Sequence, residues 1–345
     1  MTQPWWHPDR HADRREVLHA RARIKSGLRS WFDASGFIEV DPGCLQVSPG
    51  NEAHLHAFST SLMAPDLGNR RLYLHTSPEF AMKKLLAAGE DLIFAITPCF
   101  RNRERGPLHA PEFTMIEWYR ADAAYEEVMA DAARLLNVAT GVTGAKLVSW
   151  RGRTCDPAAE PERLTVAQAF LRYAGIDLTA TLAPAGLPDR DALAQALAAR
   201  GVSARAHDSW SDLFSRAIAV LIEPHLGIGR PTVLYGYPAA GSALARPIAS
   251  DPRFAERSEL YVCGVELANG FGELTDRVRQ RANLAQQMDE KERVYGERYP
   301  LDEDFLAALD LMPEASGCAL GFDRLVMLAT GATHIDQVLW TPLSF

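Results

Sequence analysis

Residues 100–120 have the sequence FRNRERGPLHAPEFTMIEWYR, and their second half shows the period-two alternation of a β-strand. One face of this strand, which covers residues 112–120, is predicted to carry Phe113, Met115, Glu117 and Tyr119. The other face carries Thr114, Ile116 and Trp118. A buried carboxylate needs a partner, so packing alone does not explain the face with Glu117.

A second strand is predicted over residues 92–100, and a polar loop with Gly106 and Pro107 joins the two strands. Arg101 follows this strand directly, which places its guanidinium beside the face that carries Glu117. Guanidinium groups bind phosphate and carboxylate through two parallel hydrogen bonds. Two interpretations carry equal weight from this segment: Arg101 binds an anionic ligand, or it forms a structural ion pair with a glutamate across the hairpin.

Residues 258–274 have the sequence SELYVCGVELANGFGEL and predict a second hairpin with its turn at residues 263–264. This turn pairs Tyr261 with Glu266 and places Glu259 on the same face as a diagonal neighbour of Glu266. Two converging carboxylates repel each other unless a cation lies between them, and oxygen ligands favour magnesium or manganese. The alternative is a pair of solvated glutamates on an exposed hairpin.

Residues 316–331 have the sequence SGCALGFDRLVMLATG and predict a glycine-rich strand that leads into a helix. Gly317 and Gly321 allow close approach of another backbone, and Asp323 can cap the helix. Arg324 lies in the first turn, where the helix dipole disfavours a positive charge unless an anion or a ring lies in front of it. Glycine-rich turns of this kind are common, so the segment alone does not establish a ligand site.

The rest of the chain predicts strands towards its two ends and helices in its middle. Helices are predicted over residues 14–34, 122–137, 165–174, 190–200, 208–223 and 276–297, and strands over residues 37–40 and 231–237. Thr165 is a candidate N-cap. The predicted fold class is therefore α+β, an antiparallel sheet flanked by helices, with a helical insertion over residues 151–230. We expect residues 1–345 to form one domain.

The composition limits the classes of function. The chain has 345 residues, of which 47% are hydrophobic and 23% charged, as is typical of globular enzymes. With a net charge of -8, the protein lacks the positive electrostatic field of a general nucleic-acid binder. Basic residues still gather in the first predicted helix, either as a solvated face, which we favour, or as a docking surface for an acidic partner: Arg10, Arg14, Arg15, Arg21, Arg23, Lys25 and Arg29.

Cysteine usage and hydrophobicity bear on the compartment. The five cysteines form no CxxC pair, which argues against a zinc site and a disulfide framework and favours a reducing cytoplasm. The N-terminus lacks the apolar run of a signal peptide. The sequence also contains no apolar stretch of the length that spans a bilayer. We therefore expect a cytoplasmic protein without a membrane partner.

Taken together, these segments resemble the signature motifs of class II aminoacyl-tRNA synthetases, and among them the lysyl branch. GFIEVDPGCL (36–45) resembles motif 1, in which Pro42 takes the place of the proline at the dimer interface. Residues 100–120 resemble motif 2, and GCALGFDRLVML (317–328) resembles motif 3. TSPEFAMKKLLAAG (76–89) and ELANGFGELTD (266–276) are similar to the lysyl branch specifically, and the resemblance covers about residues 12–343.

The resemblance implies roles for individual residues. Arg101 and Arg324 would be the catalytic groups: Arg101 would bind the α-phosphate and the reacting carboxylate, and Arg324 would stack on adenine opposite Phe113. Glu259 and Glu266 would hold Mg²⁺ on the phosphates. The ATP site would comprise Arg101, Asn102, Arg103, Glu104, His109, Phe113, Glu266, Leu267, Gly321 and Arg324. The amino-acid pocket would comprise Ser77, Pro78, Glu79, Glu117, Tyr119, Glu273 and Ala319, whose carboxylates suit a substrate with two ammonium groups.

Two positions depart from the family pattern. Arg103 stands where the family usually has the glutamate that contacts the adenine amino group, and Ala110 stands where asparagine is usual. Glu104, or the backbone at Arg103, could substitute for the missing glutamate. The resemblance therefore implies ATP binding and leaves the nucleotide preference open.

Two further features separate the chain from lysyl-tRNA synthetases. The motif 1 helix begins close to the start of the sequence, which leaves no room for an anticodon-reading domain, so we expect no anticodon-dependent binding of tRNA. Ala319 belongs to GCALG, where lysyl-tRNA synthetases resemble GLGIG, and its methyl group narrows the region near the substrate α-amino group. Both features resemble the truncated paralogues that attach (R)-β-lysine to a lysine of elongation factor P.

The function implied is that of a homodimeric ligase that uses ATP and Mg²⁺. It would activate (R)-β-lysine or lysine as an adenylate and transfer it to the ε-amino group of a lysine on elongation factor P, which releases AMP and pyrophosphate. Two alternatives stay open: a minimal lysyl-tRNA synthetase-like enzyme, and a non-catalytic synthetase-like regulator. Ala319 argues against the first, and retention of both arginines and both metal carboxylates argues against the second.

Overall fold

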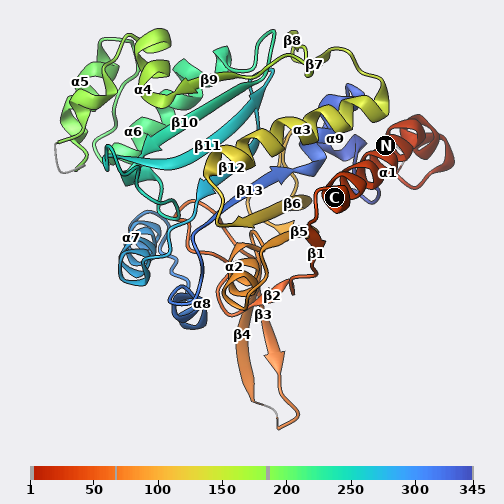
Figure 1. Cartoon of the computed structure of the whole chain (residues 1–345), viewed down its shortest axis with the longest axis horizontal. Coiled ribbons are helices and arrows are strands. Elements are labelled where there is room, and N and C mark those ends of the chain that lie inside the picture. The colour runs from red at the N-terminus through yellow and green to blue at the C-terminus, as the bar shows by residue number, and fades with distance from the viewer. Residues whose placement is uncertain (1–3, 67, 184–186, 344–345) are drawn as a thin grey trace.

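The computed structural model describes residues 4–66, 68–183 and 187–343. Its centre is an eight-stranded sheet with the strand order β1-β5-β6-β13-β12-β11-β10-β9 (Figure 1). The strands are β1 (Ile38–Glu39), β5 (Leu92–Phe100), β6 (Glu112–Ala121), β13 (Ala315–Gly321), β12 (Val265–Gly272), β11 (Phe254–Val262), β10 (Thr232–Pro238) and β9 (Glu162–Thr165). The inner pairings are antiparallel, as predicted, whereas the edge strands β1 and β9 run parallel to their neighbours.

Three helices pack together against one face of this sheet (Figure 1). They are α1 (Pro8–Ala34), α3 (Tyr125–Thr143) and α9 (Phe322–Thr330). The largest hydrophobic core lies between these helices and the sheet, and Ile116 and Trp118 of β6 are completely buried in it. The period-two prediction for β6 is thus confirmed. Glu117 and Tyr119 alternate with these core residues and therefore face the opposite side of the sheet.

Three more helices form a second core with the opposite face of the central sheet, and a small sheet lies on the same side of the molecule (Figure 1). The helices are α2 (Glu79–Ala87), α7 (Arg277–Tyr295) and α8 (Glu303–Ala308), and the small sheet comprises β2 (Leu45–Gln46), β4 (Asn69–Leu74) and β3 (Ser59–Met63). Phe80 of α2 stacks on Phe305 of α8 with ring centroids 4.1 Å apart. The β3–β4 hairpin projects from the body, and all five residues of β3 are exposed.

The insertion over residues 151–230 contains the three predicted helical segments. They are α4 (Val166–Ala169) with a π-helical turn (Phe170–Ala174), α5 (Arg190–Ala198), and α6 (Trp210–Ala217) with a second π-helical turn (Ile218–Ile222). Thr165 caps α4, and its side chain and that of Gln168 satisfy each other's backbone N–H groups. The insertion also supplies strand β9, and its core includes Leu234 and Tyr237 of β10, so it is joined firmly to the main sheet.

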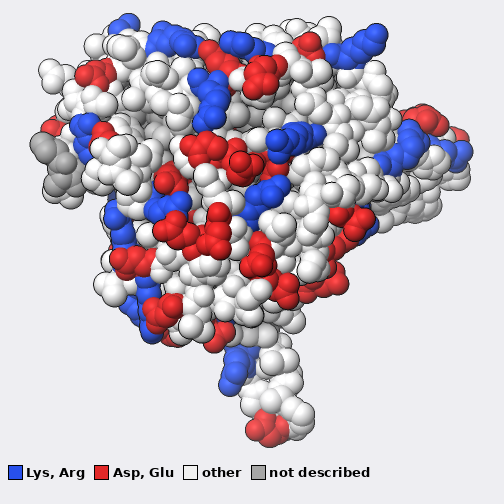
Figure 2. All heavy atoms as spheres, viewed as in Figure 1, with Lys and Arg blue, Asp and Glu red and all other residues white. Residues whose placement is uncertain are grey.

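Short elements complete the chain. They are the ribbon of β7 (Val148–Trp150) and β8 (Arg153–Cys155) and the 3₁₀ turns Leu178–Thr181, Glu223–His225, Ala239–Gly241 and Ile335–Gln337. Acidic and basic side chains alternate over the face shown in Figure 2, without one large field of a single sign. In the described part of the chain, no helix is both long and apolar enough to cross a membrane.

The second predicted hairpin forms with the predicted register near its turn. Tyr261 pairs with Glu266, and Cys263 adopts the left-handed conformation (φ 55°) that a tight hairpin turn requires. The register shifts just beyond this point, because Leu260 pairs with Ala268 and leaves one extra residue on β12. This β-bulge was not predicted, and it bends β12 next to the paired glutamates.

Asp323 and Arg21 overturn two predictions. Asp323 does not cap α9, because its carboxylate accepts a hydrogen bond from Thr114 N at 2.6 Å and another from the Arg21 guanidinium. Arg21 also donates to Thr114 Oγ1 at 2.9 Å and is buried, so the interpretation as a solvated face is wrong for this residue. Arg21 lies on the same stripe of α1 as the buried Ile24 and Leu28, and it joins α1 to β6 and α9.

We predict that Arg21→Met lowers the free energy of unfolding by about 3 kcal/mol, because it leaves a buried carboxylate without its cation. Urea denaturation followed by tryptophan fluorescence measures this change. Arg23→Met, at an exposed position of the same helix, is the matched control and should change stability by less than about 0.5 kcal/mol. Equal midpoints and slopes for the two variants would contradict the prediction.

Candidate active site

Glu117 lies in the middle of the sheet, on the face opposite the large helical layer. Its neighbours on the adjacent strands are Ala95 of β5 and Ala319 of β13, whose short side chains leave the carboxyl group accessible to nearby loops. Ser77 Oγ donates a hydrogen bond to Glu117 Oε2 at 2.7 Å, and the Tyr119 hydroxyl donates to Oε1 at 2.5 Å. Three residues of the predicted amino-acid pocket are thus in direct contact.

Lys83 of α2 lies in the same pocket, and the sequence analysis gave it no role. Its Nζ is 2.5 Å from Glu79 Oε1 and 2.5 Å from Glu273 Oε2. Glu273 therefore returns to this pocket, as predicted for the segment after β12. The available signal was the spacing of Glu79 and Lys83, which are four residues apart on one helix. Pro78 immediately precedes this helix as its N-cap residue.

Burial changes the protonation of these groups. Desolvation, followed by the nearby charge of Glu79, raises the pKa of Glu117 to about 8. Desolvation opposes the charge of Lys83, but the carboxylates of Glu273 and Glu79 together raise its pKa above the ordinary value. At neutral pH the pocket thus combines a charged ammonium group with acids of increased proton affinity.

Gly317 of β13 is needed for this packing. A Cβ atom at this position would lie 2.3 Å from Tyr119 Cε1 and 2.5 Å from Glu273 Oε1, so the close approach at Gly317 is made by side chains and not by the backbone that was predicted. The same prediction is wrong for Gly321, the N-cap residue of α9, where a Cβ would meet no atom nearer than 3.5 Å.

The two predicted catalytic arginines lie at the edge of the sheet where β5 and β13 end and β6 begins. Arg101 donates from Nε to Thr76 O at 3.3 Å, and its guanidinium lies 5.2 Å from the ring centroid of Phe113. Arg324 donates from Nη1 to Glu266 O at 2.9 Å, and its Nη2 lies 2.7 Å from His109 Nε2. Desolvation, and then the charge of Arg324, lowers the pKa of His109.

In the loop after Arg101, the side chains of successive residues point in different directions. Arg103 has a left-handed backbone (φ 66°), and its guanidinium forms an ion pair with Glu297. The structure therefore does not bring the Arg103 side chain to the other predicted ATP residues. Asn102 is held by its own N–H, which donates to His56 O at 2.6 Å. The charge of Glu104 contributes to raising the pKa of both Glu52 and His109.

The carboxylate of Glu259 is surrounded by protein donors. Tyr261 donates its hydroxyl hydrogen bond at 2.6 Å, Tyr237 donates a second, and Arg257 Nη2 donates at 2.7 Å. Glu266 has a more open carboxylate, 4.0 Å from Arg324 Nη1. Desolvation and the charge of Glu259 raise the pKa of Glu266. The predicted repulsion between these two acids is therefore present.

The residues fit a cation at Glu266, although they do not form a complete metal site. Within residues 4–66, 68–183 and 187–343, no three His, Cys, Asp or Glu side chains are grouped as metal ligands. Mg²⁺ commonly takes one or two carboxylates and completes its shell with phosphates and water. Glu266 offers such an oxygen, and a cation beside it would relieve the repulsion from Glu259.

A cleft of about 650 Å³ contains these carboxylates and opens between the insertion and α7. Its lining includes Glu52, Arg257 and Phe271, which the sequence analysis did not assign to the site. Arg257 is bound between Glu259 and Asn269 Oδ1, the latter at 3.3 Å from its Nε. The predicted Leu267 is buried in the core and can present only its backbone to a ligand.

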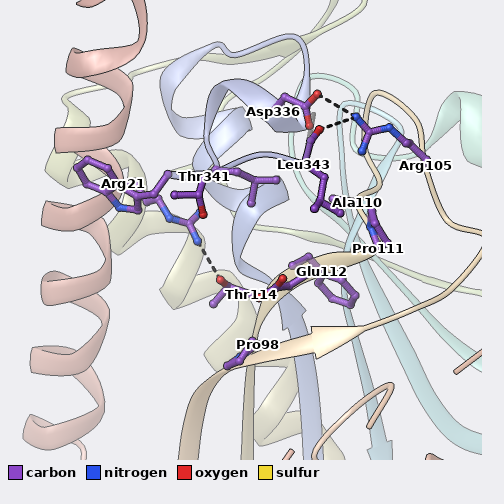
Figure 3. Close-up of a pocket in the computed structure, with 13 residues that line it drawn as sticks. Arg21, Pro98, Arg105, Ala110, Pro111, Glu112, Thr114, Asp336, Thr341 and Leu343 are labelled. Carbon is purple, nitrogen blue, oxygen red and sulfur yellow. Dashed lines mark hydrogen bonds and ion pairs between the residues drawn. The ribbon is translucent and has the colours of Figure 1, made fainter. Parts of the chain in front are cut away.

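A separate cavity of about 180 Å³ lies between α1, the loop before β6 and the C-terminal segment (Figure 3). Arg21 points into it from α1, and Phe113 forms part of its wall. On the other side Arg105 Nη2 donates to Leu343 O at 3.1 Å and lies 3.6 Å from Asp336 Oδ2. These contacts hold the loop before β6 against the body and so limit the movement of Phe113.

Comparison with known proteins agrees with the motif analysis. Residues 1–344 match the family described as tRNA synthetases class II (D, K and N). A protein named elongation factor P--(R)-beta-lysine ligase from Proteus mirabilis is 37% identical over 330 residues, which cover 94% of each chain. Proteins of the same name from Avibacterium paragallinarum (36% identity, 98% of each chain) and Edwardsiella ictaluri (38% identity, 93% of each chain) are similar in the same way.

We predict that Glu117→Gln removes a pH dependence of stability. Because the folded pKa of about 8 exceeds the ordinary value of 4.5, the unfolded chain releases a proton that the folded protein keeps. The contribution of Glu117 to stability is therefore full below pH 4.5 and is lost as the pH rises through 8. Urea denaturation from about pH 5 to about pH 8.5 should show the variant gaining stability relative to the wild type.

Glu112→Gln is the control for this measurement, since Glu112 lies on the same strand and is exposed. The free energy of unfolding of Glu112→Gln should change with pH in the same way as that of the wild type. A constant difference between Glu117→Gln and the wild type would contradict the prediction.

Proposed function

The chain belongs to the family of class II tRNA synthetases (D, K and N), and on this basis we propose that it is an ATP-dependent ligase for elongation factor P. It joins (R)-β-lysine to the ε-amino group of a lysine on that protein and releases AMP and pyrophosphate. Support comes from relatives named elongation factor P--(R)-beta-lysine ligase, which are 36–38% identical and aligned over 93–98% of their length.

The charges in the amino-acid pocket are the main support for a lysine isomer as the substrate. Three carboxyl groups, those of Glu79, Glu117 and Glu273, surround the one ammonium group of Lys83. Glu117 keeps its proton in the free pocket at neutral pH because its pKa is raised to about 8. A substrate ammonium group beside it would favour the ionised form, and three ionised carboxylates beside one ammonium group would leave two negative charges to be compensated. Lysine and its β isomer each bring two ammonium groups, and buried charges require such pairing. A neutral or acidic amino acid would leave the carboxylates unpaired.

The first step joins the substrate to AMP. A carboxylate oxygen of the lysine isomer attacks the α-phosphorus of ATP, a new O–P bond forms, and the bond to pyrophosphate breaks. Arg101 holds the two reacting anions together and Arg324 binds the nucleotide, so both act by positioning and by neutralising charge. Bound Mg²⁺, with Glu266 as a ligand, would neutralise further phosphate charge.

The second step transfers the activated group. The neutral ε-amine of the acceptor lysine attacks the adenylate carbonyl carbon, an amide bond forms, and the bond to the AMP oxygen breaks. The same cleft of about 650 Å³ admits the acceptor side chain, because it connects the site with solvent beside the insertion and α7.

We also propose that the protein is a cytoplasmic homodimer. Apolar side chains are exposed near Pro42 in the sequence, namely Ile38, Leu45 and Val47, and on the projecting hairpin, namely Leu62 and Met63. The projecting hairpin that carries the last two is mostly uncharged in Figure 2, and exposed apolar patches commonly mark protein interfaces. All five cysteines are free thiols, which suits a reducing compartment.

Mass spectrometry of the acceptor tests the proposed function. The protein is incubated with ATP, one lysine isomer and purified elongation factor P, and the factor is then weighed. We expect the mass to rise by one lysyl residue, with (R)-β-lysine more effective than α-lysine, and we expect ATP–pyrophosphate exchange to show the same order. Arg324→Ala should abolish both signals while the protein remains folded. Charging of bulk tRNA without modification of the factor would favour a minimal synthetase instead.

Ala319→Gly tests the choice between isomers. Ala319 is the neighbour of Glu117 across the sheet, so removal of its methyl group enlarges the pocket beside that carboxyl group. We expect the ratio of kcat/KM for α-lysine over β-lysine to rise by about tenfold, the effect of one methyl group in a pocket. ATP–pyrophosphate exchange with each isomer measures the ratio, and an unchanged ratio would exclude Ala319 as a specificity residue.

A further inference from the structure

Glu52 lies at the boundary between the nucleotide side and the amino-acid side of the site. Its side chain lines the large cleft, together with Glu259 and Glu266 on the nucleotide side. It also lines a small pocket with Ser77 and Glu79 on the amino-acid side. An aminoacyl-adenylate joins an amino acid to a nucleotide, so its carbonyl carbon must lie at such a boundary.

The carboxylate of Glu52 differs from the acids that line the amino-acid pocket, and from Glu259, because it has no bound partner. Glu117 accepts two hydrogen bonds, Glu259 accepts three, and Glu79 and Glu273 share the ammonium group of Lys83. Among the residues that the structure describes, none forms a hydrogen bond or an ion pair with the side chain of Glu52. This carboxylate is therefore free to accept a proton from a ligand.

The backbone around Glu52 is nevertheless held firmly. Ala53 N donates to Gln287 Oε1 at 3.1 Å, and Lys291 Nζ donates to Ala53 O at 3.1 Å and to Leu55 O at 2.6 Å. Both Gln287 and Lys291 belong to α7. The helix thus fixes the position of Glu52 and leaves its side chain without a structural task.

We propose that Glu52 is the general base that deprotonates the acceptor lysine in the transfer step. This inference rests on the proposed function. The acceptor arrives as an ammonium ion, and Glu52 takes one proton from it to become a carboxylic acid. The nitrogen lone pair then attacks the adenylate carbonyl carbon, the C–N bond forms, and the C–O bond to AMP breaks with its electron pair on the phosphate. The second proton of the nitrogen passes to solvent.

The charges around Glu52 suit this role. Desolvation raises its pKa, which increases its affinity for a proton. Arg101 at the end of β5 and Arg257 of β11 act in the opposite direction, whereas Glu79 of α2 and Glu104 of the following loop add to the increase. A base needs a raised pKa to take a proton from an amine, and it must still be ionised when the amine arrives.

The competing role for Glu52 is to bind an ammonium group of the substrate. The two roles differ in the half-reaction that they affect, because a substrate ligand acts before adenylate formation and a base acts after it. ATP–pyrophosphate exchange reports the first half-reaction alone. Transfer from preformed adenylate to elongation factor P reports the second.

Glu52→Gln, which keeps the size and polarity of the side chain, tests the proposal, with Glu52→Asp as the conservative variant. In single-turnover transfer to elongation factor P, we expect Glu52→Gln to lose about 100-fold or more, far beyond any loss in exchange. Glu52→Asp should recover part of the rate. The wild-type transfer rate should fall as the pH is lowered through the pKa of Glu52, and this acidic limb should be missing from the Gln variant.

Hydroxylamine gives a second measurement, because it is uncharged at neutral pH and needs no base. It should capture the adenylate as a hydroxamate at similar rates in the wild type and in Glu52→Gln. A raised KM for the lysine isomer in exchange, an equal loss in both half-reactions, or an undiminished transfer rate would overturn the role of Glu52. Absence of exchange in the wild type would instead refute the proposed function itself.

Discussion

The ammonium group of Lys83 lies between the buried carboxylate of Glu273 and the partly buried carboxylate of Glu79, and the amino-acid side of the site depends on this charge compensation. Glu79 begins α2 and Glu273 follows β12, so the two acids come from distant parts of the chain. Without Lys83 the buried Glu273 would lose its ion-pair partner, which typically costs several kcal/mol. The ion pairs therefore hold α2 against the sheet and keep the pocket in shape before a ligand binds. Such preorganisation is a main source of catalytic power in charged sites.

The antiparallel sheet places the two sides of the site next to each other. Gly321 at the end of β13 pairs with Met115 near the start of β6, and Phe100 at the end of β5 pairs with Glu112. Arg101 and Arg324 leave the sheet just after β5 and β13, so both arrive at the same edge. Of the acids on the amino-acid side, Glu117 lies further along β6, within the sheet, whereas Glu79 belongs to α2 and Glu273 follows β12. The residues proposed to bind phosphate and those proposed to bind ammonium groups are therefore only a few strand residues apart on the same sheet.

Much of this arrangement was predictable from local patterns. The alternation over residues 112–120 identified the core face and the polar face of β6, and the turn at residues 263–264 set the pairing of Tyr261 with Glu266. The bulge in β12 was not predictable, because a single extra residue leaves no mark in a hydrophobic pattern. Arg21 was misjudged as solvated for a similar reason: a charged residue on an apolar stripe reveals its burial only through its partner.

Periodicity and turn chemistry act over a few neighbouring residues. The sequence alone was therefore sufficient for the inner strands of the central sheet, their two hairpins and the family motifs that contain the arginines, but the short strands of the small sheet were missed. Charge partners are different, because folding brings together residues that are far apart in the chain. Arg21 and Asp323 are 302 positions apart. The free carboxylate of Glu52 becomes noticeable only when it is seen to line both the large cleft and the pocket of Ser77 and Glu79 without a partner. Partnership and burial are properties of the packed molecule, and they emerge only when the whole chain is folded.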